Sequence, residues 1–443
     1  MVIVFLLVVV SVIVGANWYV WRRLFRDTTR TPGGRRAGAV VLAGGWALAI
    51  GALVAERAGA PFWLQRTLAW PGFLWLALSI YLLLGVVAGE VVRPLLLRLL
   101  ERRDARRGPA DAGVARPAPR PEPIPAGAPP QEAVSQEPPD GPVPDEPPTE
   151  GAGPETGTTT SGEEPAHSGP SRRLFVSRVV AGAAAAAAVG TVGAGTYGVL
   201  DGPGVKRVTV PLAKLPRAAH GFRIAVVSDV HLGPVLGRGF AQKVVDTINS
   251  TQPDLIAVVG DLVDGSVKDL GPAAAPLARL RARHGTYFVT GNHEYFSGAG
   301  QWIEQVRRLG MRPLENARTE LPWFDLAGVN DVAGESEGQG PDFARALGDR
   351  DTTRACVLLA HQPVQIHEAV EHHVDLQLSG HTHGGQLWPG NLVAAAANPT
   401  LAGLERYGDT QLYVSRGAGA WGPPTRVGAP SDITVIELAS AQA

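Results

Sequence analysis

Four long, uncharged runs of apolar residues stand out in the first half of the chain. They cover residues 2–21, 37–55, 67–89 and 179–200. Each is long enough to cross a bilayer as a helix, which takes about 20 residues at 1.5 Å per residue. The last run is mostly Ala and Gly, and a water-soluble Ala-rich helix is the alternative interpretation. Because the run has no charged face, we expect a fourth transmembrane helix.

Arginine is distributed unevenly around these runs. Six arginines lie between the first and second runs and six more between residues 93 and 107, whereas the loop between the second and third runs has only Arg57 and Arg66. Cytoplasmic loops are enriched in Lys and Arg, so both dense clusters are expected in the cytoplasm. The sequence therefore predicts a multi-pass cell-membrane protein in which everything after residue 200 is extracytoplasmic.

The composition changes abruptly before the fourth run. Residues 108–170 contain seventeen prolines and eleven acidic residues against two arginines, so they are expected to form a disordered linker. Arg172 and Arg173 follow it and resemble a twin-arginine export signal, although an ordinary basic flank explains them equally well. We divide the chain into three spans (1–103), a linker (104–170), a fourth span with its flank (171–200) and a C-terminal domain (201–443).

Short β-branched runs alternate with helical segments in the C-terminal domain, which is the pattern of an α/β fold. Strands are predicted at residues 223–230, 255–259, 286–290, 324–328, 355–360, 374–378, 412–415 and 433–438. Helices are predicted at residues 239–249, 272–283, 299–309 and 364–370.

Composition excludes some kinds of function. The single cysteine rules out a disulfide scaffold and a Cys-rich zinc cluster, so any metal must be bound by His, Asp, Glu or Asn. A net charge of −1 argues against a dedicated nucleic-acid binder, whose affinity would depend on a basic surface.

Polar residues that can bind a metal follow the ends of five predicted strands. A single His is usually structural and a single Asp is often a helix cap, but five such sites in succession make separate structural explanations improbable. Ligands gather beyond the carboxyl ends of strands in open α/β sheets, so we expect these side chains to converge. They are Asp229, His231, Asp261, Asn292, His293, His361, His381 and His383.

These motifs resemble the signature of the calcineurin-like metallophosphoesterases. The matching blocks, in order, are Asp229-Val230-His231, Gly260-Asp261 through Asp264, Gly291-Asn292-His293-Glu294, His361 and Gly380-His381-Thr382-His383. The surroundings of the last two blocks resemble the membrane-bound or exported YkuE-like branch. The resemblance covers about residues 220–438 and implies a four-layer αββα sandwich of two mixed sheets.

The resemblance also implies a pair of divalent metal ions. Asp229, His231 and His383 would hold one ion, whereas Asn292, His361 and His381 would hold the other. Asp261 would bridge the two, since a carboxylate tolerates two adjacent positive charges. This donor set without thiolate suits Mn, Fe or Zn.

The implied reaction is in-line attack on phosphorus by a hydroxide that bridges the two metals. His293 is the candidate general acid for the leaving oxygen. Asp264 would fix the His293 tautomer, although an exposed loop acid is the alternative.

The chain departs from the protein phosphatases of this superfamily in one respect. They carry an arginine directly after the acid that matches Asp264, and this chain has Gly265. Without that phosphate clamp a phosphoprotein substrate is less favoured. We expect a phosphodiesterase acting on envelope lipids or cell-wall phosphodiesters, with a phosphomonoesterase or a non-catalytic membrane scaffold as alternatives. Arg416 is either a substrate contact or a surface residue.

Overall fold

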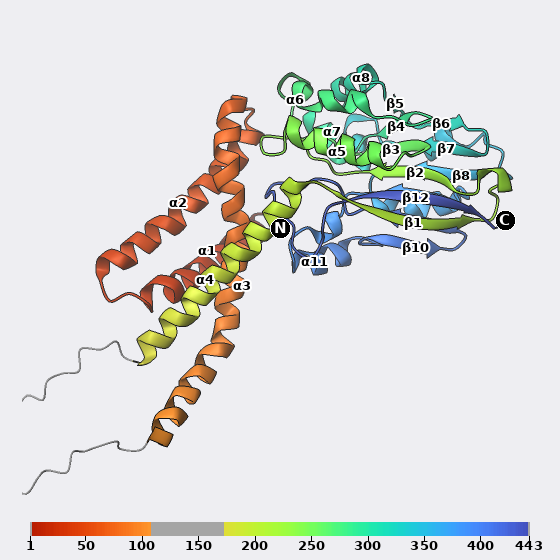
Figure 1. The fold of residues 1–443 in the computed structure, drawn as a ribbon. Helices are drawn as coiled ribbons and strands as arrows, with labels where there is room; N and C mark the ends of the chain where they lie inside the picture. The colour runs from red at the N-terminus through yellow and green to blue at the C-terminus, as the bar shows by residue number, and fades with distance from the viewer. Residues whose placement is uncertain (1, 108–171, 442–443) are drawn as a thin grey trace, which may run out of the picture.

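The computed structural model describes residues 2–107 and 172–441 and consists of a group of long helices beside an α/β domain (Figure 1). The predicted linker from residue 108 onward lies outside the described residues. The long helices are α1 (Val2–Trp21), α2 (Pro32–Arg57), α3 (Phe62–Arg107) and α4 (Arg172–Asp201), with a short π-helix (Arg22–Arg26) after α1. All four contain a segment long and apolar enough to cross a membrane.

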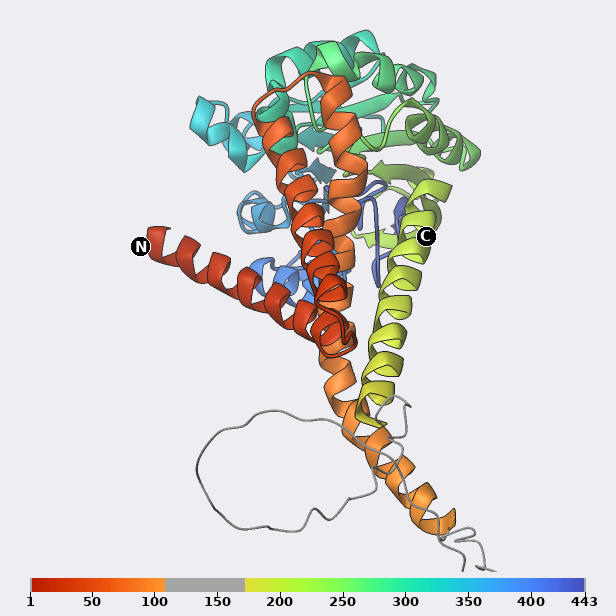
Figure 2. The same cartoon turned by 90° about the vertical axis from the view of Figure 1, so that its left-hand side faces the viewer.

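Small residues let these helices approach closely. Gly72 of α3 faces the Leu48 carbonyl of α2, and Gly85 of α3 faces Ala184 of α4, where any larger side chain would push the backbones apart. Figure 2 shows α2 and α3 running side by side, with α4 beside the lower part of α3. Such contacts are typical of helices that pack within a bilayer.

Charged residues join the helices near the middle of α3. Arg23 pairs with Glu90 of α3 at 2.7 Å, and Glu90 also contacts Arg93 at 3.3 Å. Arg178 of α4 donates to the carbonyl of Thr28 at 3.0 Å. The loop after α1, the middle of α3 and the start of α4 therefore lie together.

The first sheet has the order β1-β12-β2-β3-β4-β5 and is mixed. Strand β12 runs parallel to β1 and antiparallel to β2, whereas β2, β3, β4 and β5 are parallel to one another. Its strands are β1 (Gly204–Leu212), β2 (Phe222–Val227), β3 (Leu255–Val259), β4 (Thr286–Val289), β5 (Arg312–Pro313) and β12 (Asp432–Ser440).

The second sheet has the order β10-β11-β9-β8-β7-β6. Its four inner strands are parallel, and the two edge strands are antiparallel to their neighbours. Its strands are β6 (Ala317–Glu320), β7 (Phe324–Gly328), β8 (Ala355–Leu359), β9 (Leu376–Ser379), β10 (Gly403–Tyr407) and β11 (Thr410–Val414).

The two sheets pack face to face, and helices cover their outer faces. The core between the sheets contains Ile224, Tyr287, Phe324 and Leu378. The helices of the domain are α5 (Arg238–Ser250), α6 (Val267–Ala274), α7 (Asn292–Ser297), α8 (Ala299–Arg308), α9 (Phe343–Leu347), α10 (Ile366–Glu371) and α11 (Gly390–Ala397). Residues of α5, α6 and α8 pack on the first sheet and residues of α9 and α10 on the second, which confirms the expected αββα sandwich.

The expected elements differ from the structure at the sheet edges and in one helix. Edge strands β1, β5, β6 and β10 were not expected, because their exposed residues carry no continuous apolar run. The helix predicted at residues 272–283 is wrong: α6 ends at Ala274, and a 3₁₀ turn follows to Arg279. Pro276 cannot donate its backbone nitrogen to a continuing α-helix, which accounts for the change.

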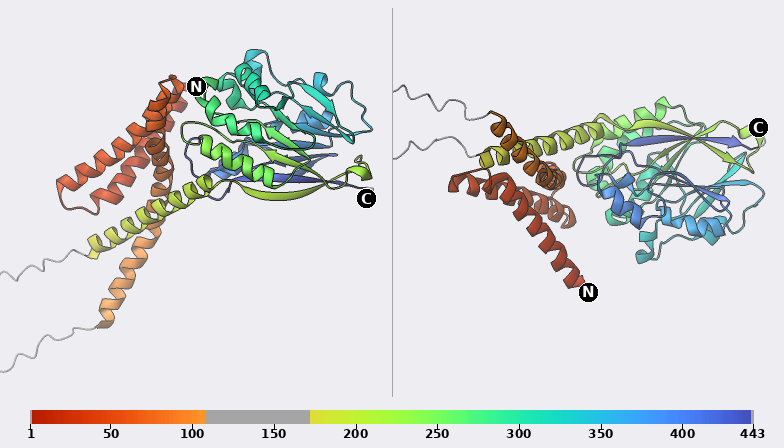
Figure 3. Two further views of the ribbon diagram at one scale, coloured as in Figure 1. Left: turned by 45° about the horizontal axis from the view of Figure 1, so that its top comes forward. Right: turned by 90° about the horizontal axis from the view of Figure 1, so that it is seen from below.

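The α/β domain is packed directly against the helices (Figure 3). Only residues 202 and 203 separate α4 from β1. Val199 of α4 is part of the core of the first sheet, and Phe62 of α3 packs against the same core. Tyr81 of α3 donates a hydrogen bond to the Trp388 carbonyl at 2.9 Å. The domain is therefore held against the helices by apolar and polar contacts.

We expect Phe324→Ala to lower the free energy of unfolding of the α/β domain by about 3–5 kcal/mol, because Phe324 is fully buried between the sheets. Phe296→Ala is the matched control, since that side chain is 69% exposed, and it should change the value little. Denaturant unfolding of the full chain in detergent measures both. Equal effects of the two substitutions would contradict the assigned core.

Candidate metal centre

The expected ligand residues all stand at the carboxyl ends of parallel strands. Asp229 and His231 follow β2, Asp261 follows β3, and Asn292 begins α7 directly after β4. In the second sheet His361 follows β8, and His381 and His383 follow β9. The two sheets are packed face to face, so these ends meet at one edge of the sandwich. The structure brings all seven residues together there.

An unusual backbone conformation holds most of these residues. The angle φ is +53° at Asp229, +48° at His231, +52° at Asp261, +73° at His381 and +53° at His383. Non-glycine residues rarely adopt this left-handed region, which costs of order 1–3 kcal/mol each. Such strain persists only where the surrounding structure fixes it, and it gathers at functional sites.

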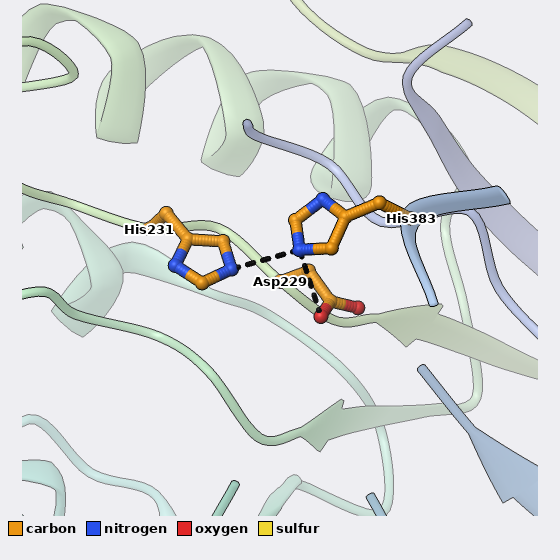
Figure 4. A group of neighbouring side chains, drawn as sticks. All are labelled: Asp229, His231 and His383. Atoms are coloured by element: carbon orange, nitrogen blue, oxygen red, sulfur yellow. Dashed lines mark hydrogen bonds and ion pairs between the residues drawn. The ribbon is translucent and has the colours of Figure 1, made fainter. Parts of the chain in front are cut away.

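A first group of side chains consists of Asp229, His231 and His383 (Figure 4). The Nε2 atoms of His231 and His383 are 3.0 Å apart, and His383 Nε2 is 3.4 Å from Asp229 Oδ1. All three residues are buried. Two ring nitrogens and one carboxylate oxygen therefore face the same small volume.

A second group surrounds Asp261. Its Oδ2 lies 3.2 Å from His361 Nε2 and 3.8 Å from His231 Nε2, so this carboxylate stands between the two groups. His381 belongs to the second group, and its Nδ1 is 3.1 Å from Asn292 Oδ1. The arrangement is the one expected if Asp261 bridges two cations.

The donor atoms of both groups fit metal ions. His361 Nδ1 is 2.8 Å from the Val259 carbonyl, to which it donates. The fully buried His361 Nε2 lies 3.2 Å from Asp261 Oδ2 but makes no hydrogen bond of good geometry among the described residues. A buried polar atom without a partner is unfavourable, and a cation would satisfy it.

Burial lowers the pKa values of His231 and His361, but the neighbouring carboxylates outweigh burial and raise them, so a metal ion would replace a proton at these rings. Burial raises the pKa of Asp229, so a nearby cation would stabilise its ionised form. Burial also opposes ionisation of Asp261, but the neighbouring His361 and His231 outweigh it and lower the pKa of Asp261. Burial together with the charge of His361 lowers the pKa of His381 to about 4, which leaves its ring neutral at pH 7 and able to bind a metal.

His293 lies at the edge of this centre and is oriented by Asp264. Oδ1 of Asp264 is 2.7 Å from His293 Nδ1 and 2.8 Å from His231 Nδ1, so one carboxylate positions both rings. Burial lowers the pKa of His293, but the hydrogen bond and charge of Asp264 outweigh burial and raise it to about 9. The Nε2 of His293 is not used in this contact. Asp264 is only 10% exposed, unlike a loop acid in solvent.

Two further residues support the centre. The buried Glu294 carboxylate accepts backbone N–H bonds from Asp261, Leu262 and Gly291, which ties the loop after β3 to α7. Arg426 was not expected from the sequence. It is buried, donates to the His383 carbonyl and has its Nη2 3.0 Å from His383 Nδ1. No local motif marks this arginine, because it reaches His383 from 43 residues away.

The remaining candidate residues lie elsewhere. The other histidines fall outside the groups of ligand atoms found among the described residues; they are His220, His284, His367, His372 and His373. Arg416 is half-buried, and its side chain lies near Gly384. Cys356 is a free, buried thiol whose pKa is raised to about 12 by burial, which makes it unreactive at neutral pH.

Comparison with known proteins agrees with this geometry. The family model described as calcineurin-like phosphoesterase matches residues 222–385. An uncharacterized metallophosphoesterase of Aquifex aeolicus is 35% identical over 53% of the chain and 91% of its own length. The chain belongs to the calcineurin-like metallophosphoesterase family. Metallophosphoesterases of this family are metal-dependent phosphoester hydrolases.

Other relatives are also named as metallophosphoesterases, and one of them is described as a transmembrane protein. A transmembrane protein with metallophosphoesterase domain from Danio rerio is 37% identical over 55% of this chain and 60% of its own length. The uncharacterized metallophosphoesterase YkuE of Bacillus subtilis is 30% identical over 52% of this chain and 84% of its own. The chain spans about three fifths of the length of the Danio rerio relative, and the aligned part is about half of this chain.

We expect His361→Ala to weaken metal binding by at least about 100-fold, because it removes a side chain with a buried, unpartnered nitrogen from the second group. His367→Ala is the matched control, since His367 is exposed and outside both groups. Metal bound per full-length chain after loading with Mn²⁺ and dialysis measures the effect. Equal metal content in both variants would contradict the assigned ligand.

Proposed function

We propose that this protein is a membrane-anchored phosphodiesterase with a binuclear metal centre. The observation that carries the proposal is the meeting of Asp229, His231, Asp261, His361, His381 and His383 around one small volume, with His293 at its edge. Asn292 completes the second group of ligands through its contact with His381.

Divalent ions at such a centre acidify water and neutralise negative charge on phosphoryl oxygens, which is the chemistry they would supply here. The residues of the chain then have distinct tasks. Asp261 keeps the two groups of ligands at a fixed separation, and Glu294 holds the backbone that carries Asp261. Arg426 holds the loop that carries His383 by donating to the His383 carbonyl, and Asp264 orients the ring of His231.

The leaving oxygen needs a proton, and His293 is placed to donate it. With its Nδ1 hydrogen-bonded to Asp264, its protonated Nε2 is the free donor at the edge of the centre. A raised pKa keeps this proton in place at neutral pH. Loss of that proton at alkaline pH leaves an alkoxide unprotonated and slows the reaction.

A diester fits the charge of the site better than a monoester. A phosphomonoester dianion is commonly bound by arginine or lysine. Of the described residues that line the cavity beside His231 and Asp264, none is Lys or Arg, and the position after Asp264 is a glycine. A monoanionic diester needs less compensating charge, which supports the phosphodiesterase over the phosphomonoesterase.

Lipid phosphodiesters of the envelope are the proposed substrates because of what surrounds the centre. The exposed apolar side chains Trp388, Leu392 and Val393 lie on and just before α11, and Trp421 is exposed near His293. Trp388 is tied to α3 through Tyr81. Apolar surface continuous with the membrane helices suits a bilayer.

The same helices support an extracytoplasmic domain. The α2–α3 connection and the end of α4 lie beside the domain, and the arginine-rich segments lie at the opposite end of the helices. That separation agrees with the uneven distribution of arginine, which orients the arginine-rich end towards the cytoplasm.

We expect His293→Ala to lower kcat about 10²–10⁴-fold on a dialkyl phosphodiester, the usual contribution of general acid catalysis. The kcat of the variant on a p-nitrophenyl diester should fall much less, because the p-nitrophenolate leaving group departs without a proton. His367→Ala serves as the control, and full-length protein of unchanged metal content is compared. Equal losses on both substrates would contradict the acid role. Faster hydrolysis of matched monoesters by the native protein would favour the phosphomonoesterase.

We expect Asp264→Asn to move the alkaline limit of activity to lower pH. The Asp264 carboxylate raises the pKa of His293 to about 9, so its removal lowers that pKa and the acid loses its proton sooner as pH rises. The pH profile of kcat on the dialkyl diester, in protein of matched metal content, measures the shift. If the activity of the variant falls at the same alkaline pH as that of the native protein, the pKa of His293 does not depend on Asp264.

A further inference from the structure

A small cavity lies beside His231 and Asp264 at the metal centre. It admits little more than a water molecule, and His231 and Asp264 are among the residues that line it. Ala420 and Gly422 also line it, and the ring of the intervening Trp421 lies 5.7 Å from that of His293. Asp264 also contacts His293, the proposed acid for the leaving oxygen, so the cavity lies next to the place from which the leaving group would depart.

Part of the wall of this cavity belongs to the membrane helices rather than to the α/β domain. Glu56, near the end of α2, and Phe73 of α3 both line it. Phe73 is buried and forms an apolar cluster with Ala52 and Ala69, against which Val235 of the domain packs. We call α2 together with residues 62–89 of α3 the membrane hairpin. The hairpin is docked against the domain and completes the cavity.

Glu56 has no hydrogen-bond or ion-pair partner among the described residues, although it is half-buried. Its charge interacts with those of Asp264, His293 and His231 as well as with the adjacent Arg57. A carboxylate in this place repels the phosphate anion and offers that anion nothing. It does, however, suit a positive charge carried by the group that leaves. Phe73 in the same wall adds an aromatic ring, which also attracts cations.

We propose that the cavity binds the ammonium group of an amino-alcohol leaving group, with Glu56 as the residue that selects it. The inference rests on the proposed phosphodiesterase function and names its substrate class, a phosphodiester of an amino alcohol such as ethanolamine. The cavity has room for a group about the size of a water molecule, which suits an ammonium group and leaves the rest of the diester outside.

The reaction transfers no electrons and needs only water. A bond forms between the water oxygen and phosphorus, and the bond between phosphorus and the amino-alcohol oxygen breaks. His293 gives its proton to the departing oxygen, and the proton lost by the water goes to solvent. The products are a phosphomonoester and a free amino alcohol whose ammonium passes Glu56.

The same head group occurs in membrane phospholipids and in soluble glycerophosphodiesters. The position of Glu56 and Phe73 on the membrane hairpin places the cavity next to lipid. A phospholipid therefore reaches the cavity over a shorter distance than a soluble diester does. The experiment therefore compares both sources with matched diesters of glycerol, which carry no ammonium.

The test uses the full chain, loaded with Mn²⁺ and reconstituted in lipid nanodiscs. Hydrolysis of phosphatidylethanolamine is compared with that of phosphatidylglycerol, and glycerophosphoethanolamine with glycerophosphoglycerol. We expect kcat/KM to favour ethanolamine in the native protein and Glu56→Gln to reduce that preference about tenfold, the value of one charge-assisted hydrogen bond. Glu56→Asp should restore part of it.

Glu101→Gln is the matched control. It also removes a carboxylate from α3, but at an exposed position at the far end of that helix, and it should keep the native preference. A preference seen only with the phospholipids supports the proposal with lipid as the source, and a preference seen with both pairs supports it for either source.

Two results would overturn the inference in distinguishable ways. If Glu56→Gln keeps the native ratio of kcat/KM between the ethanolamine and glycerol diesters while both are still hydrolysed, the cavity does not bind the ammonium group. The proposed phosphodiesterase function is then unaffected. If the native, metal-loaded protein hydrolyses none of the diesters, the proposed function fails and the inference fails with it.

Discussion

Four carboxylates and five imidazoles are packed at one edge of the sandwich with little access to water, which is unfavourable unless each charge is compensated. Much of the compensation is visible. Asp264 contacts two imidazoles, Glu294 accepts three backbone N–H bonds, and Asp229 accepts from the backbone of His381. Nε2 of His361 is left without a hydrogen bond among the described residues. Cations would complete the balance, so we expect metal binding and the stability of this edge to be coupled.

Much of the α/β domain could be predicted from the sequence because its inner strands are short apolar runs, as in β3 and β8, where every residue is buried. Candidate site residues could be named because each follows such a strand and the spacing repeats a known signature. Edge strands such as β1 could not be predicted in this way, because half-exposed strands need no continuous apolar run. The role of Arg426 could not be predicted either, because this buried arginine contacts a residue that is distant in sequence.

The position of Glu56 could not be anticipated at all. From the sequence it is an acid at the end of a membrane span, and nothing local connects it to Asp264, which lies more than 200 residues later. Only the docking of the membrane hairpin against the domain joins them, through Phe62, Phe73 and Val235. The membrane helices thus contribute to the shape of the site as well as anchoring it.

The connection between α4 and β1 limits how the domain can move. Two residues reach at most about 7 Å when extended. The long proline-rich segment precedes α4, so it gives the domain no additional reach. If the substrate is a membrane lipid, as proposed, a catalytic centre connected this closely to α4 would meet it by lateral diffusion within one leaflet. Its turnover would then depend on the surface density of the lipid rather than on a bulk concentration.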